Sequence, residues 1–345
     1  MNIDIAQLEA ERKKALTKCI ITFLIAIITP VVFFIIIPGF ITIIGIISLI
    51  IGGFIITSTS NKFKTKFKNE IMPIAASTIL KEVTFSSNGG IPSSVIEFTN
   101  SMSTGDVYRS SNLISGKYKD VGVSMCDLNI QDRTEDSDGH TSYTTIFQGQ
   151  WLIFDFNKNF KANVQVWEKN LLGGISRNIF HVLKKVELED IDFNKKFKVL
   201  SQNELESFYI MTPNMMEKIK EVEKEVSGVL LLVFIDSKLH VGIKNGKTSF
   251  NVSLFTPINL EDFTRKCLRD LNAIIKFIDI LDLDNDLFIS RPNSLKEKVS
   301  TTPIVEQTTT PILEEQKIIQ PSVQSNNGLD NNVDAVEYLN NLNNQ

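Results

Sequence analysis

The sequence predicts an α+β protein in which an N-terminal transmembrane helical hairpin precedes a mainly antiparallel sheet domain packed with amphipathic helices. Two observations predict this fold. An uncharged apolar run from Cys19 to Thr57 is interrupted near its middle by Pro38-Gly39. After the run, strand-like segments come in pairs joined by turn residues, with amphipathic helical segments between the pairs. Strands that pair with their sequence neighbours favour an antiparallel sheet.

The sequence predicts five regions in chain order. They are a short cytosolic N-terminus (1–18), the hairpin (19–57), a basic juxtamembrane helix (58–85), a cytosolic α+β domain (86–292) and a disordered tail (293–345).

The apolar run is nearly twice the length of one membrane-crossing helix, which needs about 20 residues. Pro38 lacks a backbone donor and Gly39 allows unusual dihedral angles, so the pair is typical of a turn. We expect one helix over about 19–37 and a second over about 40–57. A cleaved signal peptide fits poorly, because the run is overlong and no small-residue cleavage site follows it. A re-entrant hairpin that stays on one side of the membrane is an open alternative.

Basic residues flank the run on both sides and are missing from its centre. They are Arg12, Lys13, Lys14 and Lys18 before it, and Lys62, Lys64, Lys66 and Lys68 after it. The positive-inside rule then places both termini and the folded domain in the cytoplasm. The prediction is a multi-pass protein of the cell (inner) membrane.

The second basic group is a candidate site for contact with membrane lipids. A lysine near an anionic leaflet contributes about 1 kcal/mol, and the four candidates are Lys62, Lys64, Lys66 and Lys68. A topology signal at the start of a helix explains the same residues. One helical face of this segment is apolar and either lies in the membrane interface or docks on the domain: Phe63, Phe67, Ile71 and Ile74.

Hydrophobic alternation predicts strands within the domain at 114–131, 144–156, 161–167, 195–202, 229–235 and 239–244. Turn residues at 133–142 and at 236–238 predict two hairpins. Thr212-Pro213 is typical of a helix start. The last helix, over 260–283, carries an apolar stripe and should cover the sheet: Phe263, Cys267, Leu271, Ile274, Ile278 and Leu281.

The search for chemistry is mostly negative. No phosphate-binding loop, nucleophile elbow or zinc-protease motif is present, and the three cysteines lack metal-ligand spacing. His140 is expected at a solvated hairpin tip and His240 at the surface of a strand. The segment 282–288 has only a fragment of a calcium loop. We therefore predict no catalytic residue, no metal site and no cofactor, and a net charge of −4 does not favour nucleic acid as a partner.

The tail is rich in Thr, Gln, Ser and Asn, and it cannot bury enough apolar surface to fold alone. Its last residues regain a helical pattern, with Val336, Leu339 and Leu342 on one face. That face is a candidate docking element for a protein partner. A nascent helix without a partner explains the pattern equally well.

Four stretches are distinctive in this order: ISGKYKDVGVSMCDLNI, TIFQGQWLIFDFNKNFKANVQV, LEDIDFNKKFKVLSQNELESFYIMTPNMMEKI and LHVGIKNGKTSFNVSLF. Together they resemble the bacterial membrane family called domain of unknown function 3137, over about residues 60–290. The resemblance implies a two-pass membrane protein with a cytosolic domain, and it suggests another membrane protein as a partner. It brings no catalytic residue with it.

The predicted function is a non-enzymatic, membrane-tethered binding or scaffold module. Its predicted partners are membrane lipids and a protein recruited through the tail. Two alternatives stay open. One is a membrane-tethered hydrolase with a site assembled from Asp127, Asp155 and His140. The other is an anionic-lipid sensor that uses the lysines at 62–68.

Overall fold

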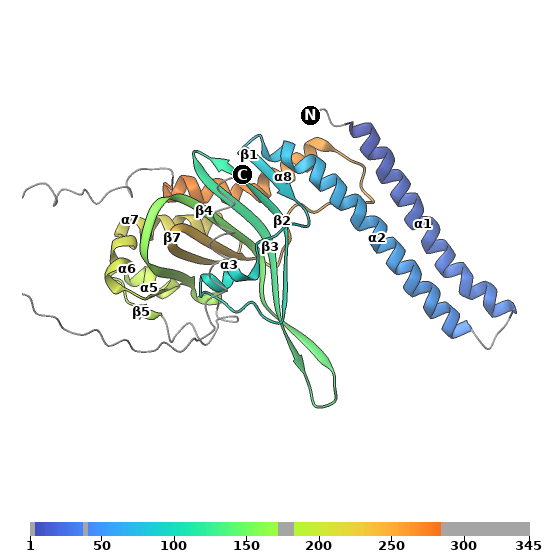
Figure 1. Cartoon of the computed structure of the whole chain (residues 1–345), viewed down its shortest axis with the longest axis horizontal. Coiled ribbons are helices and arrows are strands. Elements are labelled where there is room, and N and C mark those ends of the chain that lie inside the picture. The colour runs from blue at the N-terminus through green and yellow to red at the C-terminus, as the bar shows by residue number, and fades with distance from the viewer. Residues whose placement is uncertain (1–3, 37–40, 172–182, 284–345) are drawn as a thin grey trace, which may run out of the picture.

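Two long helices lead into a sheet that carries shorter helices against both of its faces (Figure 1). The structure is a computed structural model, and it describes residues 4–36, 41–171 and 183–283. Within these ranges the architecture is mixed α+β with an antiparallel sheet, as the sequence predicts. The predicted turn at 38–39, the terminal segment with Val336, Leu339 and Leu342, and most of 282–288 lie outside the described residues.

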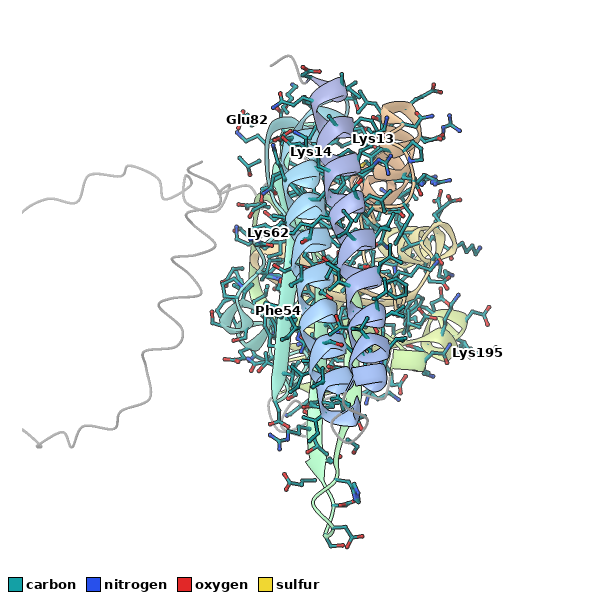
Figure 2. All side chains as sticks on the ribbon, turned by 90° about the vertical axis from the view of Figure 1, so that its right-hand side faces the viewer. Lys13, Lys14, Phe54, Lys62, Glu82 and Lys195 are labelled. Atoms are coloured by element: carbon teal, nitrogen blue, oxygen red, sulfur yellow. The ribbon has the colours of Figure 1, made fainter. Side chains whose placement is uncertain are left out.

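The two long helices are α1 (Ile5–Ile36) and α2 (Ile41–Ala76), and they lie side by side (Figures 1 and 2). Both contain a stretch that is long and apolar enough to cross a membrane. Small residues allow the helices to approach closely. A Cβ added at Gly52 would lie 2.8 Å from the Cβ of Ala26, and the Ser48 hydroxyl donates to the Ala26 carbonyl at 3.0 Å. The predicted helical hairpin is therefore present as a packed pair.

Helix α2 runs without a break from the apolar segment through the basic one. The helix predicted over 58–85 instead ends at Ala76, and Lys81–Ser86 forms strand β1. Three of the four residues on its apolar face, Phe63, Phe67 and Ile71, are buried. The ring of Phe67 meets that of Phe263 edge to face, with centroids 4.9 Å apart. Of the two alternatives for this face, docking on the domain is the one observed.

The seven described strands form one sheet in which every pairing is antiparallel. The order is β1-β2-β3-β4-β6-β5, and β7 also pairs with β4. The longest strand, β4, pairs with β3 through its first half, with β6 through its second half and with β7 through both. The bounds are β1 (Lys81–Ser86), β2 (Val107–Tyr118), β3 (Val121–Glu135), β4 (Thr141–Glu168), β5 (Lys184–Val186), β6 (Phe197–Ser201) and β7 (Val229–Lys244).

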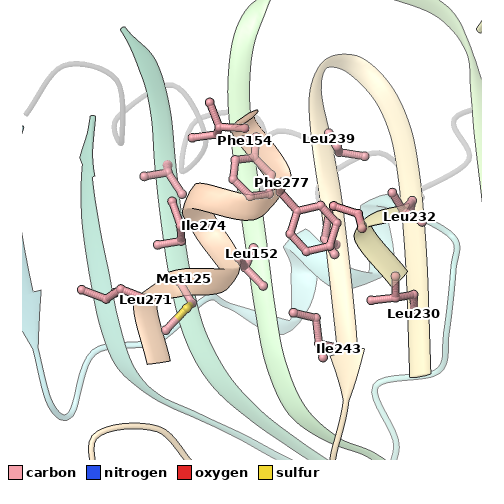
Figure 3. Close-up of a cluster of buried hydrophobic side chains, with 14 of the residues drawn as sticks. Met125, Leu152, Phe154, Leu230, Leu232, Leu239, Ile243, Leu271, Ile274 and Phe277 are labelled. Carbon is pink, nitrogen blue, oxygen red and sulfur yellow. The ribbon is translucent and has the colours of Figure 1, made fainter. Parts of the chain in front are cut away.

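Three strand predictions need correction. The strands expected separately over 144–156 and 161–167 are one continuous strand, β4. The single strand expected over 114–131 is two strands, because Lys119 and Asp120 adopt φ angles of 47° and 65° and turn β2 into β3. Positive φ at both central residues is the mark of a type I′ hairpin turn. The hairpin expected at 236–238 is instead a bend within β7, where Asp236 has a φ of 50°. Both arms of β7 pair with β4 and not with each other. Figure 3 shows this bend between the arm with Leu232 and the arm with Leu239.

Among the described residues, the α-helices after β1 are α3 (Ser93–Phe98), α5 (Ile191–Lys196), α6 (Glu204–Ile210), α7 (Pro213–Glu225) and α8 (Leu260–Leu281). The start of α7 is as predicted: the Thr212 hydroxyl accepts from the Met215 amide at 3.2 Å, and proline occupies the first helical position. All six residues predicted for the stripe of α8 are buried.

The sheet separates two apolar cores. Successive residues of β4 alternate between them: Leu152 and Phe154 belong to one core, whereas Trp151 and Ile153 belong to the other. The larger core lies between the sheet and helices α2, α7 and α8, and Figure 3 shows Phe277 of α8 against Phe154. The second core includes residues of α3. Both faces of the central strands are therefore covered.

Candidate functional site

A buried polar network lies where α2 reaches the sheet. The Lys68 ammonium donates to Oδ1 of Asn112 at 3.0 Å, and Nδ2 of Asn112 donates to Oδ2 of Asp127 at 2.6 Å. The Ser249 amide donates to both oxygens of Asp127 at 2.9 Å. Nearby, a carboxylate of α8, Asp270, accepts from the Phe250 amide at 2.7 Å. The network joins α2, β2, β3, the segment after β7 and α8.

In this network, hydrogen bonds from the protein offset the cost of burying the carboxylates of Asp127 and Asp270. Burial raises the pKa of Asp127, while the hydrogen bonds from Asn112 and Ser249 favour its charged form and lower the pKa. Burial also raises the pKa of Asp270, against the hydrogen bond from the Phe250 amide. Both oxygens of Asp127 already accept hydrogen bonds from the protein. The carboxylate therefore joins three chain segments directly: its own strand β3, strand β2 through Asn112 and the segment after β7 through Ser249.

The lysines predicted to contact lipid have different surroundings. Lys62 is exposed and Lys64 is partly exposed, whereas Lys66 forms an ion pair of 2.6 Å with Glu11 of α1. Lys68 is turned into the network described above. On α1, three further lysines are exposed at the same end of the helix pair: Lys13, Lys14 and Lys18. Figure 2 shows Lys13, Lys14 and Lys62 along this end, with Phe54 further down the pair.

The residues proposed for a hydrolase are not brought together. Asp127 lies opposite Gln150 in the sheet, five positions along β4 from Asp155, which corresponds to about 17 Å. Asp155 forms an ion pair of 2.8 Å with Lys238. His140 is at the β3–β4 hairpin tip with its side chain 82% exposed, as predicted, 3.5 Å from Asp136. These three groups cannot act on one substrate atom in this arrangement.

The surface position predicted for His240 is wrong. Its side chain is completely buried, and neither ring nitrogen has a hydrogen-bond partner. The imidazole lies beside the indole of Trp151, with ring centroids 6.2 Å apart, and that indole N–H also has no partner. Burial lowers the pKa of His240 to about 3, with a smaller contribution from Lys238. The side chain is therefore a neutral imidazole at neutral pH.

A second junction connects α1 to the loop that precedes α8. The guanidinium of Arg12, which is only 4% exposed, donates to the Leu254 carbonyl at 2.7 Å. Its neighbour Glu9 accepts from Arg12 at 2.6 Å and from the Ile258 amide at 3.1 Å. No sequence motif marks this contact, because its two sides are more than 240 residues apart.

The described residues contain no group of three or more His, Cys, Asp or Glu side chains that could hold a metal ion. Cys19, Cys126 and Cys267 are all buried free thiols. Burial raises the pKa of Cys126 to about 11 and that of Cys267 to about 12. Neither of these two thiols is therefore an activated nucleophile.

Comparison with known proteins matches residues 145–283 to a family model described as protein of unknown function (DUF3137). The match extends from β4 to the end of α8, and it confirms the predicted resemblance over those residues. No functionally curated protein matches the chain. Among solved structures, the crystal structure of the mycobacterial trehalose monomycolate transport factor A, TtfA, is similar at a TM-score of 0.33 and 11% sequence identity. That likeness covers 61% of this chain and 90% of the other.

Proposed function

We propose that this chain is a multi-pass membrane protein that tethers a non-enzymatic binding or scaffold domain to the cytoplasmic face of the cell membrane. The observation that carries the proposal is the continuity of α2. One helix contains a membrane-length apolar stretch and then enters the core of the domain at Phe67 and Ile71. The buried network at Lys68 and the contact at Arg12 fix the domain to both helices. This arrangement suits a module that holds a bound partner at a fixed distance from the membrane.

The lipid part of the proposal depends on the charge around the helix pair. Lys13, Lys14, Lys18 and Lys62 are exposed next to the apolar stretches. Lysines at this level attract the anionic headgroups of the cytoplasmic leaflet. We assign the lipid contact to these four side chains together with Lys64, and we assign Lys66 and Lys68 a structural part.

The orientation can be tested by thiol labelling, because the native cysteines are all buried. A cysteine placed at the exposed hairpin tip, Ser142→Cys, gives one reactive thiol on the domain. A membrane-impermeant maleimide should label it only after the membrane is opened. Labelling in intact cells would place the domain outside and contradict the proposal.

The scaffold role can be tested by capture from native membranes in mild detergent. The full chain is compared with a variant in which Val336, Leu339 and Leu342 are changed to serine. A control changes Glu337 and Asn341, which the helical pattern of the sequence sets opposite Val336, Leu339 and Leu342, to alanine. A stoichiometric protein that is lost only from the serine variant supports recruitment through the tail. Equal capture by all three proteins would refute the tail as the docking element.

A further inference from the structure

The loop between β7 and α8 carries an exposed aromatic side chain that the buried contacts do not use. Phe255 is 78% exposed, whereas its neighbour Leu254 is buried. An exposed phenyl group of this size is costly in water, at roughly 25 cal/mol for each Å² of apolar surface. An exposed apolar side chain beside a membrane anchor is therefore a candidate for contact with lipid.

The backbone on both sides of Phe255 is held in place. The Leu254 carbonyl accepts from Arg12, and the Ile258 amide donates to Glu9. Further back in the loop, the Ser249 amide donates to a buried carboxylate of β3. Figure 1 shows this loop reaching away from the sheet to the helix pair. The loop that carries the exposed phenyl group is thus fixed against α1 on both sides of residue 255.

This fixed loop lies close to the start of the membrane-length apolar stretch. Beyond Arg12, the first exposed large apolar side chain of α1 is Ile20, eight residues further on, which is about 12 Å along the helix axis. The headgroup layer occupies roughly 5–8 Å on each side of the hydrocarbon core. At the level of Arg12, the loop therefore lies about 4–7 Å from that layer, a gap that a phenylalanine side chain turned toward the bilayer would span. Lys13, Lys14 and Lys18 are exposed at the same level.

We propose that Phe255 is a second membrane contact. Its phenyl group inserts into the headgroup region of the same bilayer that α1 and α2 cross. Apolar side chains such as Phe, Trp and Leu are buried about 5–10 Å into the boundary between headgroups and acyl chains when a segment lies in the membrane interface. The contact would fix the tilt of the domain relative to the membrane, because the loop is bonded to α1 on one side and to β3 on the other. This inference rests on the proposed insertion of α1 and α2.

The experiment uses the full chain in nanodiscs of phosphatidylcholine and phosphatidylglycerol, with and without bromine on the acyl chains. Bromine quenches tryptophan fluorescence only at close range. Three variants each add one tryptophan at a similarly exposed position: Phe54→Trp in α2, Phe255→Trp in the loop and Leu205→Trp in α6, which are 75%, 78% and 78% exposed. Figure 1 places α6 on the side of the sheet away from the helix pair. Emission from the two native tryptophans is common to all proteins and is subtracted.

We expect the added fluorescence to be quenched at positions 54 and 255 and not at 205. Quenching at 54 alone would overturn the loop contact and leave the membrane anchor intact. No quenching at 54 would instead overturn the membrane insertion on which both proposals rest. A blue-shifted but unquenched signal at 255 would mean that the phenyl group is covered by protein, either a partner or a second copy, and would also overturn the lipid contact.

Discussion

The buried imidazole of His240 predicts that the domain loses stability in mild acid. Burial lowers the pKa of His240 from its ordinary value of 6.5 to about 3. As the pH falls below 6.5, the unfolded chain binds a proton at this side chain and the folded chain does not. The free energy of unfolding therefore decreases between about pH 6.5 and pH 3.

The size of the effect follows from the difference in proton affinity. At pH 5 the unfolded histidine is almost fully protonated, about 1.5 pH units below its ordinary pKa, and each unit corresponds to about 1.4 kcal/mol. The loss between pH 7 and pH 5 is therefore about 2 kcal/mol. Replacing His240 with leucine removes the titrating group and two polar nitrogens without partners. The variant should lose this component of the pH dependence and be at least as stable at pH 7.

The measurement is urea unfolding of the full chain in mild detergent at pH 7 and pH 5. Fluorescence reports on the sheet, because Trp151 and Trp167 are both buried in it. The quantity compared is the stability difference between His240→Leu and the unaltered protein, since other titrating groups are common to both. His140→Leu is the control, because that side chain is 82% exposed. If the difference at His240 is the same at both pH values, the imidazole is not buried in the folded state and the reasoning fails.

Three other predictions concern the helix pair, the buried network and the loop. Gly52→Ala should destabilise the pair by about 1–3 kcal/mol, because the added Cβ would lie 2.8 Å from a side chain of α1. Gly53→Ala, which meets no atom within 4 Å, should be neutral or stabilising; equal thermal stability of the two in detergent would contradict the packing. Asp127→Ala should cost about 3 kcal/mol, because it leaves two buried donors without partners, whereas the exposed Asp138→Ala should cost little; urea unfolding distinguishes them. Arg12→Met should accelerate hydrogen exchange in the loop before α8 without changing exchange in β3. An unchanged exchange rate in the loop would show that the hydrogen bond from Arg12 does not hold the loop in place.

Elements are predicted correctly where the local sequence pattern matches the side chains that the folded protein buries. The apolar stripe of α8, the cap at Thr212 and the Asp-Gly hairpin tip all have the structures that their residues favour. The pattern fails in β7. His240 alternates with apolar neighbours, which predicts a surface position, but β7 is covered on both of its faces. The burial of His240 follows only from the folded sheet.

The remaining differences have similar causes. Lys119-Asp120 lacks the Asn-Gly signature of a tight hairpin, so the sequence pattern predicts one continuous strand where the structure has a two-residue turn between β2 and β3. The junctions at Arg12 and Asp127 bring together residues more than 100 positions apart, and no local pattern encodes them. The proposed hydrolase residues were plausible individually, and the register of the sheet then separated Asp127 from Asp155.

Because α2 is a single helix from Ile41 to Ala76, it also acts as an angular reference for the domain. Each residue of a helix turns the chain by about 100°. Deleting one residue between Phe54 and Phe63 would therefore rotate the domain by roughly a quarter turn about the axis of α2, at an almost unchanged distance from the apolar stretch. The Lys66–Glu11 and Arg12–Leu254 contacts with α1 would then be out of phase with the packing at Gly52. The length of this helix thus sets the rotation of the domain about the helix axis as well as its distance from the apolar stretch.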